Sequence, residues 1–366
     1  MQENGQKNFC DYTKFGNYLY DNKIVRLILF IFDLSTSFLI LFRKKKLPNK
    51  IEKILILKVD HIGDLLIATP AIKRLKEENP SSQIDIVVSP WAKQIVIDNP
   101  FIDNIYTLRH FIHNRHEKSF IKKIYYFIYD YLRLVFKLRK NKYDLVLVFK
   151  EYLGSIITIG RFINAGYVIG HSTSGGRFFL DKIVQWDPLK HEAEHQFEIL
   201  EPLGIRYEKE KLGYYLNFKE DDYKKVENEL IKYNLKENEF IIIHPGSGDK
   251  RRVVNRSVWL KVIEENQLPI VITGIRREEY LINEIINNTP YKDRIIKLVD
   301  VFTIKQMAIF ISKAKHLYTV ESLIMHLSSF SNTPTTIFWK LKKTINATHQ
   351  WGPLNKKELE IIRLED

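Results

Sequence analysis

Apolar runs that end in short polar loops and lead into helix-like segments recur along this chain. In KILILKVDHIGDLLIATP, positions 53–59 form a mainly apolar run with β-branched Ile54, Ile56 and Val59, and a loop with Asp60, Gly63 and Asp64 follows. Apolar residues at helical spacing come next and stop before Pro80. This pattern predicts a buried parallel strand, a tight turn and a crossover helix from Leu65. Further strands are expected at residues 84–88 and 144–149.

The same pattern returns in the second half of the chain. A polar helical segment at 220–234 is followed by apolar runs, which predict strands at 239–244, 269–273 and 316–320, and helices at 257–265 and 277–287. We therefore expect an α/β protein with two Rossmann-like domains, one at residues 51–205 and one at 206–366. The last stretch, from about residue 340, is a candidate to fold back toward the first domain.

Residues 1–50 precede the first predicted strand and contain a strongly apolar segment at 24–42. Its polar residues fall within a narrow arc of a helical wheel, and a basic run from Arg43 to Lys46 follows it. This pattern favours a helix lying in the plane of a membrane interface. A helix packed on the protein and a true membrane span are the alternatives, while the late start of the apolar run disfavours a cleaved signal peptide.

A second amphipathic segment lies at residues 119–142, where aromatic and basic side chains alternate at mixed helical spacing. It predicts a long helix. Two interpretations remain open, a surface helix that simply covers the first domain and a helix that contacts anionic lipid through its aromatic and basic residues.

Composition adds two constraints. The chain has 366 residues with 45% hydrophobic residues, which suffices for two domains and excludes a disordered chain. The net charge of +13 indicates a polyanionic surrounding, such as an anionic membrane, a phosphorylated glycan or nucleic acid. The single cysteine, Cys10, excludes an intrachain disulfide and fits a reducing cytoplasm. Because lipid explains the amphipathic segments more simply, nucleic acid is not expected as a partner.

Asp64 is the leading candidate for chemistry in the first domain, because it lies where a strand gives way to a helix. It could act as a general base that takes a proton from an acceptor hydroxyl. It could equally be a helix N-cap, as could Asp60. Spacing alone does not separate these roles. Gly63 permits close approach of a substrate.

The loop HPGSGDKRR at residues 244–252 is the candidate anion site of the second domain. Its proline and glycines force a tight loop, and Lys250, Arg251 and Arg252 supply positive charge that suits a diphosphate. The loop matches neither GxxxxGK[ST] nor GxGxxG, so neither a Walker A site nor dinucleotide redox chemistry is supported. An ordinary polar loop is the alternative.

Polar residues also follow the predicted strand at 316–320. Glu321 and Ser322 could hold ribose hydroxyls or phosphate, or simply cap the next helix. His326 lies among apolar residues, where a histidine is more often part of the core than a ligand.

Taken in order over residues 51–340, these blocks resemble the bacterial glycosyltransferase family 9 of lipopolysaccharide heptosyltransferases, which has the GT-B fold. The matching blocks are KILILKVDHIGDLLIATPAIKRLKEENP, NPFIDNIYTL, KYDLVLVF, GHSTSGGRFF, HEAEHQFEILEPLGI, HPGSGDKRRVVNRSVW, ITGIRREE and VESLIMHLSSFSNTP. The resemblance implies two facing Rossmann-like domains with a central cleft. It also implies that Asp64 is the catalytic base.

The resemblance further implies where the substrates bind. The donor-binding residues would be His244, Gly246, Ser247, Lys250, Arg252, Gly274, Glu278, Glu321, Ser322 and His326. The acceptor-side loop would hold Asp60, His61 and Gly63.

The chain departs from the family pattern at three sites. Arg252 stands where the family has a donor-loop lysine, and Val254–Asn255 replaces an aromatic–proline pair. Glu321, Ser322 and Leu323 stand where the family usually has Asp-Ser-Gly, so backbone can no longer approach phosphate without a Cβ at Leu323.

We therefore predict an inverting glycosyltransferase that moves a sugar, ADP-heptose being the expected donor, onto a lipopolysaccharide core or related lipid-linked glycan. It would act as a peripheral protein on the cytoplasmic face of the inner membrane. No cofactor and no metal are expected, because no acidic pair of the DxD type lies in a suitable context. The alternative is a catalytically degraded GT-B protein that serves as a membrane-bound binding or assembly subunit.

Overall fold

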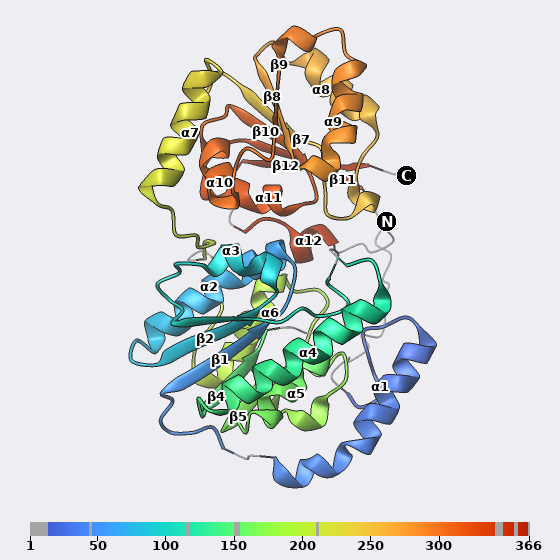
Figure 1. Cartoon of the computed structure of the whole chain (residues 1–366), viewed down its shortest axis with the longest axis vertical. Helices are drawn as coiled ribbons and strands as arrows, with labels where there is room; N and C mark the ends of the chain where they lie inside the picture. The colour runs from blue at the N-terminus through green and yellow to red at the C-terminus, as the bar shows by residue number, and fades with distance from the viewer. Residues whose placement is uncertain are drawn as a thin grey trace, which may run out of the picture. The chain divides into compact units, whose positions relative to one another are not determined.

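The computed structural model describes residues 14–43, 46–114, 117–149, 154–209, 212–340, 347–354 and 358–364 (Figure 1). Cys10 and the pair Lys44–Lys45 lie outside the described residues. The chain divides into two compact units, Met1–Tyr207 and Glu208–Asp366. That the units face each other across a cleft stays a prediction, and each unit is described by itself.

The first unit is built on a six-stranded parallel sheet in its described residues. The strand order is β3-β2-β1-β4-β5-β6. The strands are β1 (Lys53–Lys58), β2 (Gln83–Val88), β3 (Asn104–Thr107), β4 (Leu145–Val148), β5 (Tyr167–Gly170) and β6 (Lys182–Ile183). The order reverses between β1 and β4, and this topological switch point is where open α/β sheets bind ligands.

Helices cover both faces of this sheet. They are α2 (Ile62–Glu78), α3 (Lys93–Val96), α4 (Phe120–Arg139), α5 (Gly154–Phe162) and α6 (Glu192–Leu200). Alternate residues of β1, Leu55 and Leu57, pack in one core cluster with Leu134 of α4 and Ile156 of α5. Helices α2 and α6 contact each other. The predicted strands are therefore confirmed, whereas α2 begins at Ile62, three residues before its predicted start.

The N-terminal apolar segment forms two helical pieces on the first unit, α1 (Lys23–Ser35) and the 3₁₀-helix η1 (Ser37–Phe42). Asn22 caps α1, since its side chain accepts hydrogen bonds from the backbone N–H groups of Ile24 and Val25. Among the described residues, no helix combines the length and the hydropathy that a membrane span requires.

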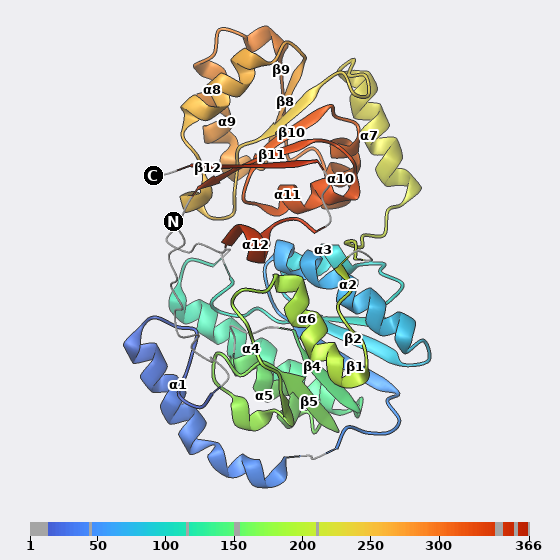
Figure 2. The same cartoon turned by 180° about the vertical axis from the view of Figure 1, so that it is seen from behind.

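The second unit repeats the architecture of the first (Figure 2). Its described residues form a parallel sheet of order β12-β11-β10-β7-β8-β9. The strands are β7 (Ile241–His244), β8 (Ile270–Gly274), β9 (Ile295–Val299), β10 (His316–Val320), β11 (Thr335–Lys340) and β12 (Leu359–Leu364). The switch point lies between β7 and β10. Two Rossmann-type sheets confirm the predicted α/β class of the GT-B type.

Two layers of helices enclose the second sheet. Helices α8 (Arg256–Glu265) and α9 (Glu279–Asn287) pack on one face through Trp259, Ile263 and Ile282. Helices α7 (Glu220–Lys232), α10 (Ile304–Ser312) and α11 (Leu323–Leu327) lie on the other side (Figure 2). The last helix, α12 (Ala347–Trp351), packs through Trp351 against Met325 and Trp339 of the second unit.

Candidate functional site

Asp64 lies at the switch point of the first unit. Strand β1 ends at Lys58, beside β4, and four residues later α2 begins at Ile62. Asp64 is the third residue of α2 and is partly exposed. The N-cap position belongs to His61, whose side chain makes no capping hydrogen bond. The prediction that Asp64 is the N-cap is therefore wrong, because the helix starts earlier than the glycine suggested.

This position suits a carboxylate at a substrate site. The first turn of a helix carries unpaired N–H groups and a partial positive charge, which attract negatively charged groups. Gly63, one residue earlier, adds no side chain beside it. The geometry is compatible with the predicted base, whose role in catalysis remains a prediction.

Asp60 is buried rather than open to solvent. Its Oδ2 lies 3.3 Å from Nζ of Lys58, and its Oδ1 accepts a 2.9 Å hydrogen bond from the His61 backbone N–H. Nζ of Lys58 also lies 3.4 Å from Oε1 of Glu192, and all three charged side chains have no exposed area. Gln196 donates to the same Oε1 at 3.1 Å. This buried network joins the end of β1 to the start of α6, and the sequence interpretation missed it.

His61, on the acceptor-side loop, lies beside two histidines of the segment after β3. Its Nε2 lies 3.1 Å from Nδ1 of His113, with the rings edge to face. His110, three residues before His113, lies 2.9 Å through Nε2 from Oγ of Ser155. The structure thus brings together residues from the loop after β1, from the segment after β3 and from α5. Acceptor binding by Asp60, His61 and Gly63 stays a prediction.

In the second unit, the loops after β7 and β10 are joined by two contacts. The Ser247 hydroxyl donates to the Glu321 carbonyl at 3.0 Å, and Nη2 of Arg252 lies 3.0 Å from Oε1 of Glu321. The Glu321 carboxylate is mostly buried, whereas the Arg252 side chain is 39% exposed. Arg251 instead forms a fork with Asp249, and Lys250 is exposed. Among the three predicted cations, Arg252 is thus the one held at the switch point.

Gly246 and Glu278 form a close pair beside this loop. A Cβ at Gly246 would lie 2.3 Å from Cδ of Glu278, so any side chain at this position requires the carboxyl group of Glu278 to move. Oε2 of Glu278 accepts a 3.2 Å hydrogen bond from the Ile275 N–H, and burial raises the pKa of Glu278 above its usual value. A Cβ at Gly274 would meet Ile282 at 2.7 Å. The structure therefore brings three predicted donor residues together.

His244 is the last residue of β7 and directly precedes this loop. Its Nδ1 lies 3.0 Å from Oγ1 of Thr273. Its carbonyl accepts a 3.2 Å hydrogen bond from the Thr319 hydroxyl. Burial lowers the pKa of His244 to about 4, so the ring is neutral at pH 7. A neutral, buried ring can position the loop but carries no charge toward a diphosphate.

Ser322 and His326 have clear structural roles. The Ser322 side chain accepts a 3.3 Å hydrogen bond from the Ile324 N–H and caps α11. His326 is buried, and its Nδ1 lies 2.9 Å from the Tyr214 hydroxyl, which also accepts from the Leu354 N–H. Donor binding by either residue remains a prediction.

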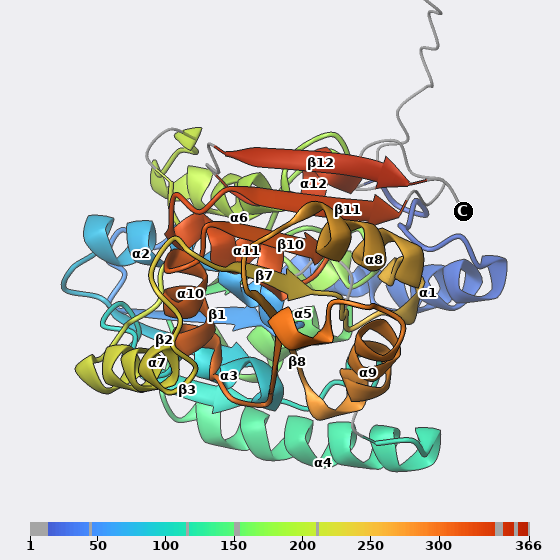
Figure 3. The same cartoon turned by 90° about the horizontal axis from the view of Figure 1, so that it is seen from above.

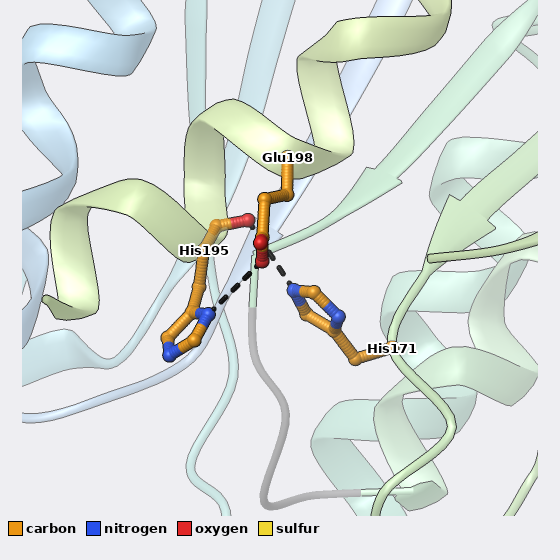
Figure 4. A group of neighbouring side chains, drawn as sticks. All are labelled: His171, His195 and Glu198. Carbon is orange, nitrogen blue, oxygen red and sulfur yellow. Dashed lines mark hydrogen bonds and ion pairs between the residues drawn. The ribbon is translucent and has the colours of Figure 1, made fainter. Parts of the chain in front are cut away.

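One cluster has the composition of a metal site. In the described residues, ligand atoms of His171, His195 and Glu198 lie within 4.8 Å of one another (Figure 4). Nδ1 of His195 lies 3.1 Å from Oε2 of Glu198, and Nζ of Lys190 lies 2.5 Å from the other oxygen. An ammonium group of the protein thus already neutralises this carboxylate. Nδ1 of His171 lies 3.1 Å from the Val184 carbonyl oxygen and its Nε2 lies 3.3 Å from the His195 carbonyl oxygen, so protein groups already engage both ring nitrogens of His171.

Comparisons with known proteins agree with this architecture. The family model described as glycosyltransferase family 9 (heptosyltransferase) matches residues 131–359. The chain is 25% identical over 338 residues to lipopolysaccharide heptosyltransferase 3 of Escherichia coli K12, covering 83% of this chain and 92% of that protein.

Solved structures show the same fold. A glycosyl transferase of family 9 from Veillonella parvula superimposes with a TM-score of 0.70 at 18% identity, covering 88% of both chains. The ADP-heptose lipopolysaccharide heptosyltransferase II of E. coli gives a TM-score of 0.63 at 17% identity, covering 85% of this chain and 90% of that one. The E. coli heptosyltransferase WaaC with ADP gives 0.62 at 16% identity, covering 85% and 93%.

Proposed function

Because this chain belongs to glycosyltransferase family 9, we propose that it transfers a heptosyl group from ADP-heptose to a lipopolysaccharide core or related lipid-linked glycan. The observation that carries the proposal is Asp64, a partly exposed carboxylate in the first turn of α2 at a topological switch point. A base at this place can serve a substrate hydroxyl.

The reaction would proceed in one displacement with inversion. Asp64 takes the proton of the acceptor hydroxyl while that oxygen attacks the anomeric carbon, and the bond to the ADP phosphate oxygen breaks. The departing diphosphate carries the negative charge that develops in the transition state. Arg252 supplies a guanidinium fork that can hold two phosphate oxygens. Lys250 adds a second, exposed cation.

An adenine nucleotide is the proposed carrier of the sugar. Support comes from the solved relatives, one titled as a heptosyltransferase with ADP and another with ADP-2-deoxy-2-fluoro heptose. In this chain, the carboxyl group of Glu278 against Gly246 offers a hydrogen-bond acceptor near the proposed phosphate loop. With a cationic loop available for the leaving group, we propose that no metal is needed.

The acceptor is proposed to be a glycan on a lipid. The curated relatives are named as lipopolysaccharide heptosyltransferases, which supports an acceptor of this kind. We place the protein at the cytoplasmic face of the inner membrane as a peripheral protein. The excess of positive charge fits a surface rich in phosphate.

Two observations favour the alternative of a catalytically degraded subunit. The donor-loop cation Arg252 is paired with Glu321, and Leu323 replaces a family glycine. Such a protein would bind neither ADP nor ADP-sugars with useful affinity. Titration calorimetry with ADP separates the two functions directly.

The catalytic proposal is tested by Asp64→Asn, which keeps size and removes the base. We expect turnover of ADP-heptose onto a lipopolysaccharide core acceptor to fall about 100- to 10,000-fold. ADP affinity should stay within about twofold, because Asp64 lies on the first unit and does not bind diphosphate. If the variant loses thermal stability but keeps its turnover, Asp64 is a structural residue and the proposed role is wrong.

A further inference from the structure

The N-terminal segment presents its apolar residues to solvent. Large side chains along α1 and η1 are exposed, with Leu41 reaching 80% of its free area. The set comprises Ile24, Leu27, Ile28, Phe30, Ile31, Leu34, Phe38, Ile40, Leu41 and Phe42. Scattered exposed apolar residues are ordinary in soluble proteins, but a continuous set of this size marks an interaction surface.

One residue of the polar stripe of α1, Asp33, faces the protein, whereas Arg26 of the same stripe is exposed. Asp33 is buried, and its Oδ1 accepts a 2.7 Å hydrogen bond from the Gly176 N–H while its Oδ2 accepts a 2.9 Å bond from the Tyr18 hydroxyl. One residue earlier, Phe32 stacks on Phe179 with ring centroids 5.8 Å apart. The helix is therefore attached through one narrow strip, and its wider apolar face points outward.

Helix α4 shows a second exposed apolar stripe on the same unit. Its members recur at spacings of three and four residues, which places them along one helix face. They are Ile121, Tyr125, Ile128, Tyr129, Leu132 and Phe136. The opposite face packs inward through Leu134 and Leu138.

Both segments rest on one hydrophobic cluster. Phe32 and Leu39 from α1 and η1, and Phe127 and Tyr131 from α4, pack against the same core, to which α5 contributes Ile157. Figures 1 and 3 show α1 and α4 on neighbouring sides of this unit. The two stripes thus belong to one structural body and not to two separate lobes.

Positive charge borders both stripes. Lys23, Arg26 and Lys46 are exposed beside α1 and η1. Exposed cations along α4 are Lys122, Arg133, Lys137, Arg139 and Lys140. Cations around apolar side chains match the chemistry of an anionic bilayer, where acyl chains lie below phosphate groups.

We propose that the outward faces of α1, η1 and α4 form a lipid-docking surface, and that α1 lies in the membrane plane with Asp33 bound to the protein. This inference rests on the proposed function only in that the acceptor is lipid-linked. The occupant is an anionic bilayer rather than a second copy of the chain, because two copies would bring these like-charged cations together.

The experiment measures co-sedimentation of the full chain with vesicles of phosphatidylcholine, with and without phosphatidylglycerol. The test variant is Ile28→Glu with Leu41→Glu, since both side chains are exposed and a fold defect is not expected. Its control is Ile231→Glu, an isoleucine on α7 of the second unit that is exposed about as much as Leu41. We expect wild type and control to bind the anionic vesicles and the double variant to bind at least about tenfold more weakly.

Three results would overturn the docking surface. One is wild-type protein that does not bind anionic vesicles, and another is a double variant that binds as well as wild type. The third is that neither protein binds vesicles, while sedimentation velocity shows a dimer for wild type and a monomer for the double variant. ADP calorimetry on the same samples keeps the two proposals apart. Vesicle binding without ADP binding refutes the transferase and leaves the surface intact, whereas the reverse refutes the surface alone.

Discussion

The ion pair between Arg252 and Glu321 makes a sharp prediction about donor binding. If the Arg252 guanidinium holds the donor diphosphate, the phosphate oxygens must take the place of the Glu321 carboxylate, whose Oε1 lies 3.0 Å from Nη2. Glu321→Gln keeps the side chain's length and removes its charge. The variant should therefore bind ADP more tightly than wild type.

The size of this gain follows from the exposure of the pair. Two unit charges about 4 Å apart attract by roughly 4 kcal/mol at an effective dielectric constant of about 20. The Arg252 side chain is 39% exposed, so solvent screening and side-chain freedom reduce the net value to about 1 kcal/mol. In wild type, ADP binding must break this ion pair at a cost of about 1 kcal/mol. The variant has no such pair to break, so it should bind ADP about fivefold more tightly.

The assay is titration calorimetry with ADP at low and high salt. Glu237→Gln is the matched control, because Glu237 forms an ion pair of the same 3.0 Å length with Lys313, and it lies just before β7, away from the strand ends that hold the donor loops. The control variant should bind ADP as wild type does. Unchanged or weaker ADP binding by Glu321→Gln would refute competition at Arg252. No ADP binding by any of the three proteins would instead favour the degraded subunit.

Two further substitutions in the second unit have expected outcomes. Gly246→Ala would place a Cβ 2.3 Å from Cδ of Glu278, so it should lower the free energy of unfolding by about 1–3 kcal/mol and weaken ADP binding. In the control variant Gly213→Ala the added Cβ meets nothing within 4 Å, so neither quantity should change. Denaturant titration measures the first quantity and calorimetry the second. Burial in the folded protein lowers the pKa of His244 from 6.5 to about 4, whereas in the unfolded chain the ring becomes charged below about pH 6.5. The free energy of unfolding therefore has its full value above pH 6.5 and decreases as the pH falls toward 4. Wild type should therefore lose about 3 kcal/mol more than His244→Asn between pH 6.5 and pH 4 in urea titrations, and equal losses would contradict this reasoning.

Local patterns in the sequence predicted the elements well, and they failed where one residue had two interpretations. Strand β1 and the end of α2 before Pro80 follow from β-branched content and from the steric effect of proline. The start of α2 did not, because Gly63 indicated a loop and Asp64 a cap. A glycine in the first helical turn costs little when neighbouring packing fixes the backbone, so tertiary structure decided the boundary.

The buried network around Lys58 shows a different limit. Lys58 and Glu192 are separated by 134 positions in the sequence, and nothing local to either residue indicates that their side chains meet at 3.4 Å. The sequence does show Lys58 at the end of an apolar strand, and a buried lysine requires a carboxylate nearby. Such a signal predicts that a partner exists but does not identify it.

Asp33 shows why the orientation of an amphipathic helix cannot be derived from its wheel. The wheel correctly separates a polar stripe from an apolar face, and the usual expectation turns the polar stripe toward water. Here the Gly176 N–H and the Tyr18 hydroxyl satisfy the carboxylate inside the protein, and this burial raises the pKa of Asp33. Because Asp33 turns toward these partners, the apolar side chains on the other side of α1 are left outward. A helix with that orientation gains free energy only when something apolar covers it, which is what a bilayer supplies.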